Sequence, residues 1–90
     1  MSFTCYAALD SASLGALGPP AQINVSAAYY IVDTATNTAV TCAGGQFSNS
    51  VNVFLNTPVA SQQAILPAVQ SAIQAAEPAR TGLAFIWIGL

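Results

Sequence analysis

The chain has 90 residues, of which 54% are hydrophobic and only 4% are charged, whereas an ordinary soluble domain is about 25% charged. This length suits a single domain over residues 1–90, and the hydrophobic content excludes a disordered chain. One basic residue is too few to neutralise phosphates, so we expect no nucleic-acid partner. Because the chain has no His, we also expect no enzyme activity, no metal and no other cofactor.

The N-terminal part predicts a strand followed by an arm. Residues 2–9 alternate between apolar and other side chains, which is typical of a strand. Residues 10–20 are small and are punctuated by Gly and Pro, which predicts a flexible loop or arm. Leu14 and Leu17 would be exposed in such an arm, because it is too small to form its own core. We therefore place both at an interface with a neighbouring subunit or with the surface of a larger particle.

The middle of the chain predicts a hairpin and a further strand. The clearest strand covers residues 22–32, and its apolar face consists of Ile23, Val25, Ala27, Tyr29 and Ile31. A turn over residues 33–38 follows, with Asp33 as a turn residue and Asn37 as the residue best able to adopt a positive φ. Residues 39–42 return as the hairpin partner. Alternation from residue 47 to residue 56 predicts the next strand.

One helix is predicted after residue 56. Asn56 or Thr57 is suited to cap it and Pro58 to occupy its first turn, and Pro78 ends it. Pro67 lies inside the pattern and should kink or restart the helix. The apolar stripe consists of Ile65, Leu66, Val69, Ile73 and Ala76.

Residues 81–90 predict a closing strand that is apolar on both faces. Together these elements predict an α+β fold, a four- to five-stranded and mostly antiparallel sheet with one helix on one face. A single helix covers only one face of the last strand, on which Phe85 and Trp87 alternate with Ile86 and Ile88. We therefore predict that these four residues include an interface, on whichever face the helix leaves uncovered.

The remaining candidate residues have structural interpretations. Cys5 and Cys42 lie in apolar alternating stretches and are expected to be buried free thiols, although one disulfide is the alternative. Glu77 and Arg80 flank the predicted helix end and are expected to form a solvated pair there. The longest apolar run, residues 83–88, is far shorter than the roughly 20 residues that a membrane-spanning helix requires. The N-terminus also lacks the basic and apolar regions of a signal peptide, so we expect synthesis in a cytoplasm and no membrane partner.

The composition predicts assembly. A folded monomer of 9.2 kDa exposes about 4,900 Å², and four charged residues cannot cover that surface. We expect a subunit of a homo-oligomer or a larger shell, with a small neutral monomer as the alternative.

The neutral Thr/Asn/Ser turn within residues 30–40 and the strand–helix–strand ending over residues 51–90 resemble small phage virion proteins, namely capsid decoration or cement subunits and head–tail accessories. The resemblance implies a β-rich structural protein that binds a capsid as a dimer or trimer and stabilises it. Its partners would then be further copies of itself and a major capsid protein, and its location the virion. The other hypotheses are a subunit of a surface filament and a small-molecule binding module that uses the aromatic side chains of residues 85–88.

Overall fold

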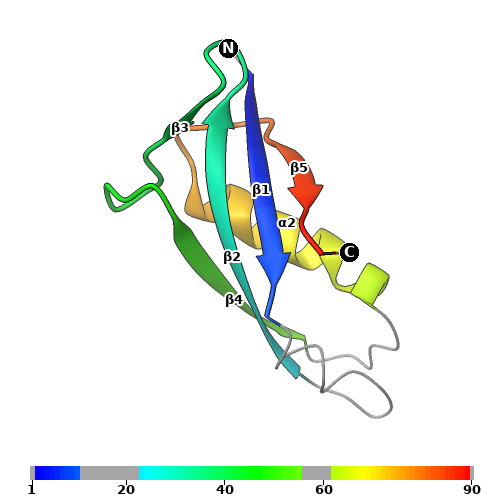
Figure 1. Ribbon diagram of the computed structural model, residues 1–90. Coiled ribbons are helices and arrows are strands. Elements are labelled where there is room, and N and C mark those ends of the chain that lie inside the picture. The colour runs from blue at the N-terminus through cyan, green and yellow to red at the C-terminus, as the bar shows by residue number, and fades with distance from the viewer. Residues whose placement is uncertain (1, 11–22, 56–61, 90) are drawn as a thin grey trace.

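The computed structural model of the protein describes residues 2–10, 23–55 and 62–89, which form a five-stranded mixed sheet and one α-helix (Figure 1). The predicted α+β fold is confirmed. In chain order the elements are β1 (Phe3–Leu9), β2 (Ile23–Asp33), β3 (Thr38–Val40), β4 (Asn49–Leu55), the 3₁₀ turn η1 (Gln62–Ala64), α2 (Leu66–Ala76) and β5 (Ala84–Trp87). Within these ranges, no helix is both long and apolar enough to cross a membrane.

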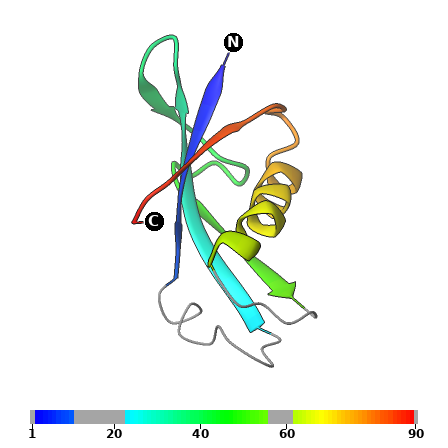
Figure 2. The same ribbon diagram turned by 90° about the vertical axis from the view of Figure 1, so that its right-hand side faces the viewer.

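The sheet is organised around β2, its longest strand. β2 pairs antiparallel with β1 along one edge and antiparallel with β3 and β4 along the other. β5 pairs parallel with β1, at the edge of the sheet opposite β4. The chain must therefore cross over one face of the sheet between β4 and β5. Helix α2 lies on this crossover, and Figure 2 shows it on one side of the sheet.

Helix α2 covers only one of the two faces of the sheet. We call the face toward α2 the inner face and the opposite one the outer face. Alternate residues of β1 and β2 reach the inner face and are buried with one stripe of the helix, as the alternation predicts. These buried residues are Cys5, Ala7, Val25, Ala27, Tyr29, Ile31, Ile65, Val69 and Ile73.

Helix α2 begins and ends where two prolines allow. Its first residue is Leu66 and Pro67 lies in its first turn, so the expected restart at this proline is confirmed. The helix ends at Ala76, before Pro78, also as predicted. The predicted cap at Asn56 or Thr57 and the expected role of Pro58 concern residues outside the described ranges, and so do the interface predictions for Leu14 and Leu17.

Positive backbone φ angles occur in the turn after β2 and on both sides of β5. Asn37 has a φ of 54°, as predicted, and the Asp33 carboxylate accepts a hydrogen bond of 2.9 Å from the Ala35 amide, which makes Asp33 a turn residue. Gly82 and Gly89, with φ angles of 70° and 82°, lie on either side of β5. Because extended pairing does not continue through such residues, β5 has four residues and is shorter than the predicted strand over 81–90.

Candidate functional site

The outer face is the largest feature that the fold of the described residues leaves unexplained. The register of the strands arranges its side chains in rows that run across β2, β1 and β5. One row consists of Tyr30, Tyr6 and Ile86, which are paired neighbours on these strands. The Tyr6 and Tyr30 rings stack at 5.1 Å between centroids and 13° between planes. This row, which we call the ridge, therefore holds two rings in a fixed arrangement beside an aliphatic side chain.

The next row is made of small side chains. Ala8 pairs with Ala28, and Ala28 pairs in turn with Ser50 on β4. We call this row the groove, because its Ala and Ser side chains are shorter than the tyrosine side chains of the ridge. Ile88 lies at its β5 end, where the Ile88 amide donates a hydrogen bond of 2.8 Å to the Ala7 carbonyl and so continues the β1–β5 ladder.

Charge is absent from the ridge and the groove, and the row beyond the groove is polar. The exposed Phe54, which pairs with Asn24, lies beyond that polar row on the same face. The Ser26 hydroxyl donates a hydrogen bond of 2.6 Å to the Asn52 side chain, and Asp10 lies beside Ser26, where its amide donates to the Ser26 carbonyl at 2.9 Å. An apolar centre rich in aromatic residues with polar groups at its margin is the usual composition of a protein–protein interface.

The C-terminal strand divides the four residues predicted for an interface. Ile86 and Ile88 are 47% and 48% exposed, and by alternation they lie on the outer face. Phe85 and Trp87 reach the inner face, where they are half-buried against the core, and their rings lie 6.5 Å apart. The helix side is therefore the covered one, and the uncovered residues of this strand are the two isoleucines.

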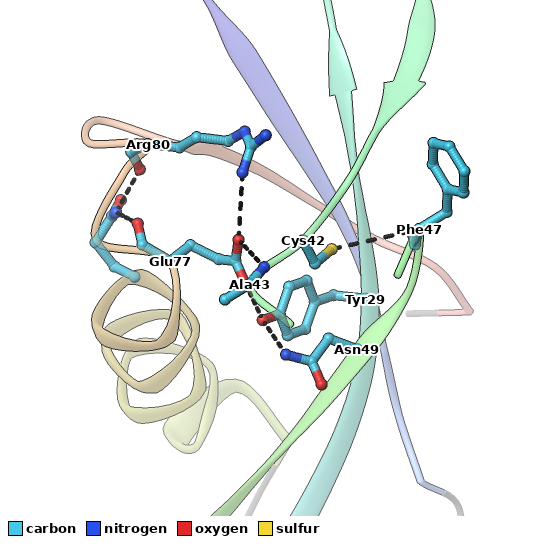
Figure 3. A network of polar contacts seen from close by, with 8 residues as sticks. Tyr29, Cys42, Ala43, Phe47, Asn49, Glu77 and Arg80 are labelled. Carbon is cyan, nitrogen blue, oxygen red and sulfur yellow. Dashed lines mark hydrogen bonds and ion pairs between the residues drawn. The ribbon is translucent and has the colours of Figure 1, made fainter. Parts of the chain in front are cut away.

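On the inner side, a polar cluster surrounds Glu77 at the end of α2 (Figure 3). The Glu77 carboxylate accepts hydrogen bonds from the Tyr29 hydroxyl at 2.7 Å and from the Ala43 amide at 3.0 Å. Asn49 donates to the Tyr29 oxygen at 3.2 Å, and the Arg80 guanidinium lies 3.6 Å from the carboxylate. The cluster thus joins the helix end to β2 and to the segment between β3 and β4.

The prediction of a solvated Glu77–Arg80 pair is wrong in one respect. The two residues do pair, but the Glu77 side chain is only 1% exposed. A carboxylate at the C-terminal end of a helix faces the negative end of the helix dipole, so its hydrogen bonds and Arg80 must offset both that field and the loss of water. Arg80 is itself held by the Phe3 ring, 5.5 Å from its guanidinium carbon.

Burial, and to a smaller extent Glu77, raises the pKa of three groups in and beside this cluster. Burial, together with the nearby Cys42 and Glu77, raises the pKa of the Cys5 thiol to about 12. Burial and Glu77 also raise the pKa of Cys42, and burial and the hydrogen bond to Glu77 raise the pKa of Tyr29. Both cysteines are buried and free, as predicted. Because the thiolate is the reactive form of Cys, both thiols are in their unreactive form at neutral pH.

The sequence contains an indication that Glu77 is buried, although the predicted apolar stripe of the helix did not include this residue. Ile65, Val69, Ile73 and Glu77 follow one another at intervals of four residues, so Glu77 continues the buried stripe of the helix. The partners that make this position tolerable, Tyr29 and the Ala43 amide, come from distant parts of the chain, and nothing local to residue 77 points to them.

The described residues offer few other features on which a function could depend. They enclose no pocket, and they contain no group of three or more His, Cys, Asp or Glu placed to hold a metal ion. No protein family model, curated protein or solved structure matches this chain. The outer face is therefore the candidate site, and its geometry suits contact with another protein surface.

Proposed function

We propose that this chain is a structural subunit of a larger protein assembly and that it attaches through the outer face of its sheet. The observation that carries the proposal is the uncovered ridge of Tyr6, Tyr30 and Ile86, with Ile88 beside it. Tyr30, Ile86 and Ile88 are among the described large hydrophobic residues that are exposed. An apolar patch of this kind marks an interaction surface more often than an ordinary surface of a monomer.

A viral particle is the setting that the proposal favours, with the chain as a capsid decoration or cement protein of a phage. The support is the resemblance in sequence character, a small and nearly uncharged β-rich chain, together with one face free for attachment. A cement subunit needs a stable fold that tolerates contact on one side, and the buried cluster around Glu77 supports such a fold on the other side.

The alternatives have less support. A subunit of a surface filament would use the same apolar face, and the form of the assembly separates this alternative from a shell protein. A small-molecule module would need an enclosed site, and none is found within the described ranges.

Sedimentation of the chain in extracts of its natural host tests the proposal. We expect the wild-type chain in fractions of particle size, and the Ile86→Lys variant near the top of the gradient with a normal circular dichroism spectrum. Ala75→Lys is the matched control, because Ala75 is exposed on α2 and away from the outer face. The proposal is overturned if the wild-type chain and Ile86→Lys both sediment as free protein.

A further inference from the structure

We infer that the outer face binds a second copy of this chain, in a two-fold dimer whose sheets meet face to face, with the ridge of each copy in the groove of the other. This inference rests on the proposed function and names the partner of the same surface. In such an isologous contact one patch must be complementary to itself. The outer face has a row of large side chains beside a row of small ones, and two such rows can complement each other across a two-fold axis.

The register of the strands would let the large residues of one row face the small residues of the other. The ridge of Tyr30, Tyr6 and Ile86 lies two residues along the strands from the groove of Ser50, Ala28 and Ala8. A two-fold axis that runs parallel to the rows, between ridge and groove, places Tyr6 and Tyr30 of one copy over the two alanines of its partner's groove. Ile86 then faces the partner copy's Ile88, so two aliphatic side chains meet at the β5 end of the contact. The same operation places the partner's ridge over the first groove. Side chains of two packed sheets interdigitate in this way at a separation of about 10 Å.

The electrostatics of the outer face are compatible with a second copy. Each chain carries a net charge of −2, so copies repel one another weakly wherever acidic residues approach. The ridge and groove contain no charged residue, and the proposed axis sets Asp10 of each copy opposite the row of Thr4 and Val32 rather than opposite another acid. A partner selected by charge would find no complementary group at the centre of this face.

The size of the face suits a dimer. A strand residue occupies about 16 Å² of sheet plane, so the five strands present a flat area of roughly 500 Å² before the relief of the side chains is added. One partner in a standard interface buries about 800 Å² of accessible surface. The stacked Tyr6 and Tyr30 rings are already ordered by each other, which lowers the entropy that association must offset.

A groove-filling substitution tests this arrangement, with mass measured by light scattering over a dilution series. We expect the wild-type protein to have twice the mass of the 9.2 kDa chain. Ala28→Tyr, which keeps the face apolar but fills the groove, should be a folded monomer. Ala75→Tyr makes the same change at an exposed position of α2 and should remain a dimer.

The possible failures separate this inference from the proposed function. An Ala28→Tyr protein that still dimerises, or a wild-type complex with an odd or open-ended number of subunits, overturns ridge-into-groove pairing and leaves the structural role intact. A purified wild-type protein that stays monomeric overturns the dimer, while co-sedimentation with particles in host extracts continues to test the proposed function. If Ala75→Tyr also dissociates, association does not depend on the outer face and the inference is wrong.

Discussion

Tyr29 and Tyr30 are neighbours in one strand, yet they belong to different environments. Tyr29 is 2% exposed on the inner face and donates its hydroxyl to Glu77, whereas Tyr30 is 39% exposed on the outer face and stacks on Tyr6. Both faces of the sheet carry large apolar side chains, but only the inner one is covered by a described element. The fold therefore explains why the inner face is apolar, and assembly is our explanation for the outer face.

Among truncations of a polar side chain, the largest expected effect is on the inner side, at Glu77. Glu77→Ala leaves the Tyr29 hydroxyl and the Ala43 amide without their acceptor and Arg80 without its carboxylate. Removing one partner of a buried charge pair typically costs about 3–5 kcal/mol of unfolding free energy, which urea denaturation would measure. Glu77→Gln, which keeps one acceptor oxygen, should lose less. A loss below about 0.5 kcal/mol for Glu77→Ala, the level of a neutral surface change, would mean that the cluster does not hold the helix.

The two tyrosines provide a matched pair of smaller changes. Tyr29→Phe removes a hydrogen bond to a carboxylate and should cost about 1.5–3 kcal/mol of unfolding free energy. Tyr30→Phe keeps the ring that stacks on Tyr6 and should alter the unfolding free energy by less than about 0.5 kcal/mol. Equal losses in chemical denaturation would contradict the assignment of these residues to different faces.

Alkaline pH should lower the unfolding free energy through groups on the inner side. The pKa of Cys5 rises from 9.0 to about 12 on folding, and those of Cys42 and Tyr29 rise as well. Above about pH 9 the unfolded chain loses protons that the folded chain keeps, so the unfolding free energy falls as pH rises. Each such group contributes a slope of about 1.4 kcal/mol per pH unit within its window.

Cys5→Ala is the control for this pH dependence. Urea denaturation between pH 8 and 11 should show that the unfolding free energy declines less steeply with pH for Cys5→Ala than for the wild-type protein. The difference should correspond to the release of one proton fewer on unfolding. Parallel declines would show that Cys5 does not keep its proton on folding.

The sequence predicted local features well and non-local ones poorly. Alternation in β2 identified its inner side chains, and Pro78 correctly marked the end of α2. The start was predicted at residues 56–58, whereas α2 begins at Leu66, next to the proline expected to kink or restart the helix. The spacing of Glu77 from the buried helix residues indicates its burial, but the partners of its carboxylate, Tyr29 at 48 positions and an amide at 34 positions, are not indicated by any local pattern. The ridge likewise forms only because β1 pairs with both β2 and β5, which sets Tyr6 between Tyr30 and Ile86.

The smallest expected effect concerns salt and the outer face. Because the ridge and groove carry no charge, assembly has little Coulomb energy to screen. We expect the dissociation constant of the assembly to stay nearly the same, or to fall slightly, between low salt and about 1 M NaCl, where the Debye length is about 3 Å. Sedimentation equilibrium would measure it. Dissociation on adding salt would instead point to a contact made by Arg80 or by one of the acidic residues.

Lysine substitution along β5 tests most directly the claim that one face of the sheet forms the fold and the other forms the assembly. The side chains of residues 85 to 88 alternate between the two faces, so one short strand provides both the test and its control. We expect Phe85→Lys and Trp87→Lys to unfold or strongly destabilise the chain in circular dichroism melts. We expect Ile86→Lys and Ile88→Lys to keep the wild-type spectrum and to reduce the mass to that of the monomer. Four variants that unfold alike, or four that stay assembled, would contradict the account.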